Sequence, residues 1–278
     1  MLSPYNKVGC RFLRQLIFSE KNVTIRCDAK GTKYSCETNR MADIEGKNME
    51  IIARIQTDFP TKFGIPRQSG LVESLKGVVT FEPKYRNPQG VYGLDGYSYI
   101  WLLWSFSENH RQGWSATVKP PRLGGNKRMG VFATRSPFRP NDIGLSCVKL
   151  ERVVLDEKKG PMLYVAGVDL MDQTPIYDIK PYIPFTDSHP DALGGFSDAV
   201  RDYALEVEFP EHLLEHFPEK KREAVIYVLQ QDPRPAYQRD ETRRYGVDFA
   251  GFDVRFHVKG NVLTVCELEE RASGMIFR

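Results

Sequence analysis

The chain has 278 residues, of which 41% are hydrophobic and 27% charged, a composition that excludes wholesale disorder and is typical of a globular protein. No window approaches the ~18 to 20 apolar residues of a membrane helix, so we expect no membrane partner. The net charge is +3, but residues 1–48 alone carry +4. A nucleic-acid-binding surface on the near-neutral remainder therefore needs a local concentration of Lys and Arg.

Residues 1–48 are polar and have no clear periodicity. The stretch FLRQLIF is too short and too interrupted by charge to be the core of a signal peptide. Met41 and Met49 are both plausible starts. We interpret residues 1–48 as an N-terminal extension that is either disordered or the product of a mis-called start, and assign it no function.

The chain is predicted to become rich in strands from Met49. The candidate segments contain β-branched or aromatic residues between Gly and Pro turns, and helical periodicity is almost absent between 49 and 186. They are residues 50–57, 77–83, 97–106, 130–134, 144–155 and 162–170. Short strands without intervening helices favour a barrel or a sandwich over a doubly wound sheet. We predict one domain over 49–186.

A second unit is predicted over 187–278, after a Pro- and Gly-rich seam at 183–196. A short strand at 204–209 precedes a helix that begins near Pro210 and that Pro218 divides. Two further strands at 252–260 and 261–270 are joined by a turn at Lys259-Gly260-Asn261. This pattern predicts a small α+β domain.

The five cysteines are widely spaced and form no C-x-x-C pair. This spacing argues against a disulfide framework and against structural zinc, so we expect no metal and a cytoplasmic location. The chain also lacks the G-x-S-x-G, H-E-x-x-H and P-loop motifs, and neither of its Gly-Gly pairs follows a strand in Rossmann form.

Residues 115–141 contain six Lys or Arg residues and no acidic residue. A charge run alone is most often a solvated face, but here Pro, Gly and Phe are interleaved with the charges. Three further segments combine stiff backbone with polar groups, namely 64–71, 169–182 and 231–237. Each segment alone is explained by a capped turn or an ion pair, whereas four together favour one preorganised site.

Six short motifs in these segments resemble those of the TrmO family, also called TsaA-like or YaeB-like. They are PRQ (66–68), PPRLGGN (120–126), MGVFATRSPFRPN (129–141), IGLS (143–146), DIKPY (178–182) and DPRPAY (232–237). The resemblance extends from about Met49 to the end of the chain. It implies a mainly β fold, with a non-Rossmann, TsaA-like β-barrel methyltransferase domain and a small C-terminal α+β domain.

The resemblance also implies an activity. TrmO-family enzymes use S-adenosylmethionine to methylate N6 of threonylcarbamoyladenosine, beside the anticodon of threonine tRNA, and act as homodimers. The residues leave two alternatives open, which are a non-catalytic RNA-binding module of the same fold and a methyltransferase with a different acceptor. Departures from the family at Ser107-Glu108, often His-Gln, and at Gln173, often Gly, motivate the first alternative.

The resemblance assigns the cofactor to five short parts of the chain. The residues implied to contact it are Pro66, Arg67, Gln68, Ser107, Glu108, Arg135, Leu145, Gln173, Thr174, Pro175 and Ile176. Leu145 and Ile176 would offer apolar walls to the adenine, and Arg67 or Arg135 would bind the carboxylate. A residue at position 173 with positive φ would be strained as Gln but not as Gly.

Catalytic and RNA-binding roles complete the expectations. Asp178 is the candidate base, with Lys180 or Arg139 as an electrostatic partner, although Asp178 is equally well interpreted as a carboxylate that orients Lys180. The candidate tRNA contacts are Arg122, Lys127, Arg128, Asn141, Tyr182, Asp232, Arg234 and Tyr237. Tyr237 would stack on an unpaired anticodon-loop base and Arg234 would hold phosphate, unless DPRPAY is only a stiff interdomain turn.

Overall fold

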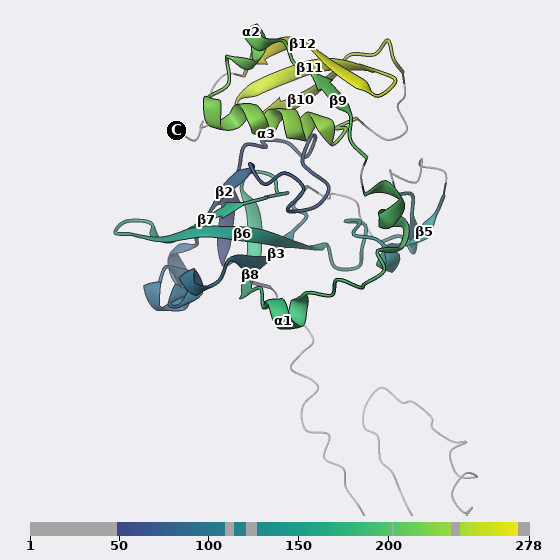
Figure 1. The fold of residues 1–278 in the computed structure, drawn as a ribbon. Coiled ribbons are helices and arrows are strands. Elements are labelled where there is room, and N and C mark those ends of the chain that lie inside the picture. Colours follow the sequence, from purple (N-terminus) through teal and green to yellow (C-terminus); the bar gives the residue numbers. More distant parts are fainter. Residues whose placement is uncertain (1–48, 109–113, 121–126, 202, 235–239, 272–278) are drawn as a thin grey trace, which may run out of the picture. The chain divides into compact units, whose positions relative to one another are not determined.

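The computed structural model describes residues 49–108, 114–120, 127–201, 203–234 and 240–271. Its first part is a closed barrel of antiparallel neighbours in the order β1-β2-β7-β6-β3-β8 (Figure 1). The strands are β1 (Ala53–Gln56), β2 (Lys76–Phe81), β3 (Tyr99–Ser105), β6 (Ile143–Asp156), β7 (Gly160–Ala166) and β8 (Thr174–Pro181). The predicted mainly β fold with a barrel is therefore confirmed.

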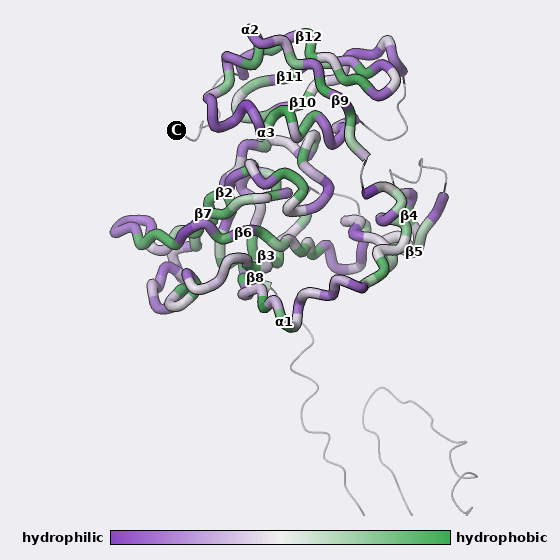
Figure 2. The backbone as a smooth tube through the Cα atoms, in the orientation of Figure 1, coloured by the Kyte–Doolittle hydropathy of each residue, from purple (hydrophilic) through white to green (hydrophobic). Residues whose placement is uncertain are grey.

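Side chains that point inward at every second position along the strands fill the barrel. In β3 the side chains of Ile100, Leu102 and Trp104 are buried, whereas their neighbours in sequence are partly or largely exposed. This period of two places every second residue in the core. The tip of the β6–β7 hairpin, at Asp156–Gly160, extends beyond the barrel and is hydrophilic (Figure 2).

The C-terminal part is a four-stranded sheet in the order β10-β11-β12-β9. Its strands are β9 (Glu206–Glu208), β10 (Tyr245–Phe249), β11 (Phe252–Lys259) and β12 (Val262–Glu270), and only the β9–β12 pair is parallel. Helices α2 (Glu211–Leu214) and α3 (Glu219–Gln230) follow Pro210 and Pro218, which occupy their N-cap positions. The predicted division of the helix at Pro218 is confirmed.

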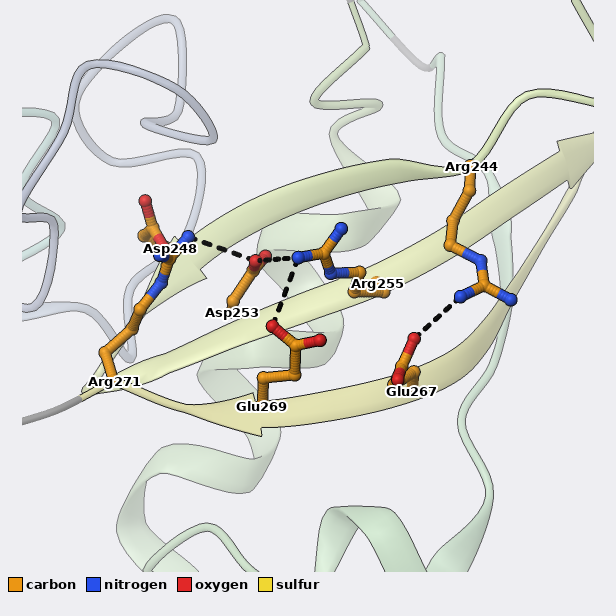
Figure 3. Close-up of polar contacts among 7 residues, drawn as sticks. All are labelled: Arg244, Asp248, Asp253, Arg255, Glu267, Glu269 and Arg271. Atoms are coloured by element: carbon orange, nitrogen blue, oxygen red, sulfur yellow. Dashed lines mark hydrogen bonds and ion pairs between the residues drawn. The ribbon is translucent and has the colours of Figure 1, made fainter.

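An ion-pair network covers part of this sheet (Figure 3). Arg271 contacts Asp248 and Asp253 at 3.0 Å each, and Arg255 bridges Asp253 and Glu269 at 3.0 and 3.1 Å. Its charges offset one another, so we interpret this network as a structural device that holds β10, β11 and β12 in register, and not as an anion site.

The structure corrects three sequence-based expectations. Of the predicted strand at 130–134, only Gly130 lies in a strand, β5 (Met129–Gly130), because Val131–Ala133 turns as a 3-10 helix. The segment 169–182, in which no strand was predicted beyond Leu170, contains the barrel-closing strand β8, in which Pro175 pairs with Arg54. Strand β10 was not predicted. Its sequence YGVDF is short and interrupted by Gly and Asp, and its pairing with β11 provides the order that its propensity lacks.

The predicted division of the chain into 1–48, 49–186 and 187–278 stays a prediction. The last barrel strand ends at Pro181, and the first strand of the second sheet begins at Glu206. Between them lie only α1 (Pro184–Asp187) and a 3-10 turn at Gly195–Val200. Residues 1–48 lie outside the described residues.

Candidate active site

A pocket of about 1040 Å³ opens at one end of the barrel. It lies where β3 ends and β6 begins, since Ser105 pairs with Ile143, and where β1 ends beside the start of β8, since Ile55 pairs with Thr174. The connections after β1, β5 and β7 contribute the rest of the wall. Antiparallel pairing thus gathers segments from four parts of the chain at one end of the barrel.

Most residues that the resemblance assigns to the cofactor lie in this pocket. Its lining includes Pro66, Arg67, Gln68, Ser107, Glu108, Arg135, Leu145 and Thr174, and also Arg139 from the candidate catalytic set. Arg135 donates a hydrogen bond from Nη1 to Oε1 of Gln68, which joins two of the motifs. Leu145 is 48% exposed and offers an apolar surface to the pocket.

Three residues of the expected far wall lie outside this lining. Ile176 is fully buried in the barrel core and Pro175 is buried within β8, whereas Gln173 is exposed. Pro175 and Ile176 follow along β8, which leads away from the pocket. Only Thr174, the first residue of β8, reaches the open end of the barrel. Of the four residues expected to form the far wall, only Thr174 is brought into the pocket.

Gln173 has φ of 62°, in the left-handed region that favours glycine. The expectation that a positive φ would strain this residue is therefore met. Its carbonyl oxygen still accepts a hydrogen bond from Arg54 Nη1 at 3.1 Å, a contact that a glycine would keep.

We expect Gln173→Gly to raise the free energy of unfolding by about 0.5 to 1 kcal/mol, since the relief of a left-handed side chain outweighs the added freedom of the unfolded chain. Urea denaturation measures this change. Gln89→Gly is the matched control, because Gln89 is exposed and its φ is not positive, and there glycine should destabilise the fold. Destabilisation by both substitutions would contradict the assignment of strain to Gln173.

Asp178 and Lys180 form an exposed ion pair of 2.9 Å on β8 and are not part of the pocket lining. Asp178 also accepts a hydrogen bond from the backbone N–H of Ile179 at 2.9 Å. These contacts favour the interpretation of Asp178 as a carboxylate that orients Lys180.

The candidate tRNA contacts fall into separate groups, all outside the pocket lining. Lys127, Arg128 and Asn141 are exposed and lie close in sequence to residues that line the pocket. Tyr182 packs against Tyr99 and Trp101. Arg122 and Tyr237 lie outside the described residues.

Asp232 and Arg234 contact each other within the second part. Arg234 Nε and Nη2 both donate to Asp232, at 2.8 and 3.0 Å, and the pair is largely buried. Burial acts to raise the pKa of Asp232, but hydrogen bonds from Arg234 and Tyr203 hold it below its usual value. This engaged guanidinium favours a structural role for Arg234, whereas residues 235–237 of DPRPAY lie outside the described residues.

Asp169 lies in the pocket, although our sequence analysis assigned it no role in the site. Ser146 donates from Oγ to Asp169 Oδ1 at 2.6 Å, and Trp104 donates from Nε1 to Ser146 Oγ at 2.9 Å. Burial raises the pKa of Asp169 to about 6, although the Ser146 hydrogen bond and the charge of Arg135 act to lower it. A carboxyl that titrates near neutrality at a pocket wall is a candidate acid–base group.

A signal for Asp169 was present in the sequence but not decisive. Asp169 follows the apolar run MLYVAGV directly, in the position where a strand delivers a side chain to the end of a barrel. Three carboxylates share the segment 169–182, and only the tertiary fold separates them. Asp169 lies at the pocket, Asp172 accepts the Thr57 N–H at 3.0 Å, and Asp178 lies on β8 outside the pocket lining.

Gly144 gives the Trp104 indole room at the pocket. Gly144 pairs with Trp104 across β3 and β6, and a Cβ atom built on it would lie 2.3 Å from the indole Cε2. A side chain at this position would therefore displace the ring whose Nε1–H reaches Ser146.

We expect Gly144→Ala to lower the free energy of unfolding by about 1 to 3 kcal/mol, the usual cost of overpacking, and to weaken ligand binding in the pocket. Chemical denaturation and calorimetry measure the two effects. Gly90→Ala serves as the control, because nothing lies within 4 Å of a Cβ at Gly90. Equal stability of the two variants would exclude a packing role for Gly144.

Across the part of the chain that the structure describes, no group of three or more His, Cys, Asp or Glu residues is arranged to hold a metal ion. No helix among the same described residues has the length and apolar character to span a membrane.

Comparisons with known proteins identify the family. The tRNA-methyltransferase O N-terminal domain matches residues 54–188, and the TrmO C-terminal domain matches residues 202–271. The chain is 41% identical over 230 residues to a tRNA (adenine(37)-N6)-methyltransferase of Escherichia coli (strain K12), covering 80% of this chain and 97% of that protein.

A mammalian relative and a solved structure support the same family. A tRNA (adenine(37)-N6)-methyltransferase of Mus musculus is 42% identical over 141 residues, which cover 50% of this chain and 31% of that protein. The crystal structure of TrmO from Pseudomonas aeruginosa superposes with a TM-score of 0.65 at 31% identity, covering 81% of this chain and 99% of that one. The barrel, its pocket and both domain matches lead to one conclusion: the chain belongs to the tRNA-methyltransferase O family.

Proposed function

We propose that this protein uses S-adenosylmethionine to methylate N6 of threonylcarbamoyladenosine at position 37 of threonine tRNA. The observation that carries the proposal is the convergence of Arg67, Arg135 and Leu145 on one pocket, in a chain that belongs to a tRNA methyltransferase family. The match to the Escherichia coli enzyme, which covers 97% of that protein, supports the same acceptor position.

The pocket fits the cofactor in volume and chemistry. At about 1040 Å³ it lies at the upper end of the range usual for small-molecule sites and leaves room for an acceptor base. Arg67 and Arg135 suit a carboxylate, because guanidinium groups bind carboxylates with paired hydrogen bonds. Leu145 and Phe106 offer apolar surface to an adenine. S-adenosylmethionine, when bound, supplies an electrophilic methyl group on its sulfonium.

Asp169 is the proposed proton acceptor of the reaction. The acceptor nitrogen is urea-like, so its lone pair is delocalised and removal of its proton assists attack on the methyl carbon. Ser146 orients the carboxylate through its hydrogen bond to Oδ1, and the carboxylate takes the proton. A pKa of about 6 keeps Asp169 ionised at neutral pH yet basic enough to accept that proton.

Arg139 is the proposed electrostatic partner. Its Nη1 donates to the backbone carbonyls of Val131 at 3.2 Å and Thr134 at 2.6 Å, which fixes the guanidinium at the pocket wall. A fixed cation is positioned to stabilise negative charge on the urea carbonyl without reorganisation during the reaction. Asp178 and Lys180 keep a supporting role on β8 in this proposal.

The basic segment 115–141 is proposed to bind the anticodon loop. Lys127 and Arg128 are exposed, and the segment contains no acidic residue to repel phosphate. Affinity for RNA should therefore fall steeply with salt. The enzyme is further proposed to be a cytoplasmic homodimer. Its free Cys147 and Cys266 fit a reducing compartment, and the dimer rests on the family resemblance.

The decisive experiment is mass spectrometry of nucleosides from threonine tRNA of a strain that lacks the gene. N6-methylated threonylcarbamoyladenosine should disappear and return when the gene is restored. Persistence of the modified nucleoside would refute the assignment of the acceptor. Calorimetry with S-adenosylmethionine separates the alternatives, because a non-catalytic RNA-binding module would not bind the cofactor at millimolar concentration.

A further inference from the structure

An exposed aromatic pair lies beside the pocket. The rings of Trp114 and Phe132 are stacked, with centroids 6.0 Å apart and planes inclined by 27°. Trp114 is 52% exposed and Phe132 is 70% exposed, so much of each side chain is presented to solvent. Large exposed aromatic groups at a site mark a binding surface more often than isolated apolar residues do.

The pair is held in place by backbone contacts. Strand β4 (Thr117–Val118) pairs with β5 in the small sheet labelled in Figure 2, and Val131 N–H donates to the Ala116 carbonyl at 3.0 Å. Phe132 lies in the 3-10 turn Val131–Ala133, and Arg128 Nε donates to Thr117 Oγ1 at 2.8 Å. The two rings therefore stand on connected backbone.

Arg139 connects the aromatic pair to the pocket. Its Cζ lies 5.8 Å from the Phe132 ring centroid, and the same side chain lines the pocket. An aromatic face next to a guanidinium is the arrangement that binds single-stranded nucleic acid, where bases stack on rings and cations contact phosphate. We call Trp114, Phe132 and Arg139 the stacking platform.

We propose that the stacking platform binds an unpaired nucleobase of the RNA substrate, next to the nucleotide that enters the pocket. This inference rests on the proposed function and adds a contact that holds the loop in an opened form. It explains why aromatic rings are exposed in a segment whose charges are all positive. Sequence-tolerant stacking holds the neighbour while the pocket selects the reacting base.

Charge decides between RNA and a second copy of the chain as the occupant. A two-fold symmetric contact would bring the same surface together from both subunits. Residues 115–141 carry Lys and Arg but no acidic residue, so such a contact would oppose like charges. RNA phosphates complement these charges.

The test uses the full-length protein and a synthetic anticodon stem-loop of threonine tRNA that carries threonylcarbamoyladenosine at position 37 and 2-aminopurine beside it. The wild-type protein should quench the 2-aminopurine, because stacking quenches its fluorescence. Phe132→Ala and Trp114→Ala should each weaken RNA binding by about tenfold or more and reduce the quenching. Phe132→Tyr, which keeps an aromatic face, should retain both.

Controls distinguish loss of the stacking platform from misfolding and from failure of the proposed function. Calorimetry with S-adenosylmethionine should give unchanged affinity in the Trp114 and Phe132 variants. Phe185→Ala should bind RNA normally although Phe185 is 88% exposed. Unchanged RNA affinity in the double variant Trp114→Ala/Phe132→Ala would overturn the platform alone. Loss of self-association in that variant, with RNA affinity intact, would assign the face to a second copy. Failure of the wild-type protein to methylate the stem-loop would instead count against the proposed function.

Discussion

Asp169→Asn is expected to lower kcat by about 10²- to 10³-fold at neutral pH, the usual contribution of a positioned general base. Asparagine keeps the shape of the side chain and can accept from Ser146, but it cannot take a proton. Affinity for S-adenosylmethionine should stay within about twofold of wild type. Single-turnover methylation of the anticodon stem-loop, together with calorimetry, measures the two quantities.

The pH dependence of the wild-type rate provides a second readout. Only the ionised carboxylate accepts a proton, so the rate should rise with pH and level off above the pKa of about 6. Ser146→Ala removes a hydrogen bond that lowers the pKa of Asp169, and should therefore move the break to higher pH. A purely structural Ser146 would change stability without moving the break.

Asp169→Asn should also stabilise the fold. The pKa of Asp169 is higher in the folded state than its ordinary value of 3.8, so the wild-type free energy of unfolding falls as pH rises from about 4 to about 6. Asp169→Asn removes the carboxyl group and with it this decrease in the free energy of unfolding. Above pH 6 the gain should be on the order of 1 to 3 kcal/mol, because solvent in the pocket screens part of the cost. Urea denaturation at pH 4 and pH 7 tests the sign.

Asp178→Asn is the comparison that decides between the two carboxylates. Asp178 is exposed and paired with Lys180 outside the pocket lining, so this variant should lose little activity. A large loss in Asp178→Asn with little loss in Asp169→Asn would reverse the assignment. A loss of cofactor affinity in Asp169→Asn would make Asp169 a binding residue instead of the proton acceptor.

Arg135→Ala is expected to weaken binding of S-adenosylmethionine by about 10- to 100-fold, the value of a charge-assisted hydrogen bond to a carboxylate. Arg135→Lys keeps the charge but loses the paired geometry, so its affinity should be intermediate. The charge of Arg135 also lowers the pKa of Asp169, so the break in the pH profile of Arg135→Ala should move upward.

A cofactor fragment shows which group Arg135 binds. 5′-Methylthioadenosine lacks the amino acid part of the cofactor, so wild type and Arg135→Ala should bind it equally. An equal loss for both ligands would place Arg135 at the adenosine or in a structural role. Arg128→Ala is the matched control on the same basic segment, because Arg128 contacts Thr117 and does not line the pocket.

The motifs predicted much of the pocket because cofactor contacts are made by short, stiff segments. Arg67, Arg135 and Leu145 stand in such segments, and they meet at one end of the barrel. The prediction failed to gather Pro175 and Ile176 because they follow Thr174 along β8. A strand alternates its side chains and carries the chain away from the pocket, whereas a loop would have kept all three residues near one another.

Motif order and strand periodicity can be read along the chain, so the sequence alone indicated the family and the mainly β character. For position 173 it predicted strain only on the condition of a positive φ, and the fold supplies that φ. Only the tertiary structure decided which of three carboxylates reaches the pocket. It also showed that Arg234 is engaged by Asp232 and that Phe132 stacks on Trp114. These outcomes depend on strand register and on contacts between residues distant in sequence. Burial and neighbouring groups, and not residue type, determine what a charged or aromatic side chain can do.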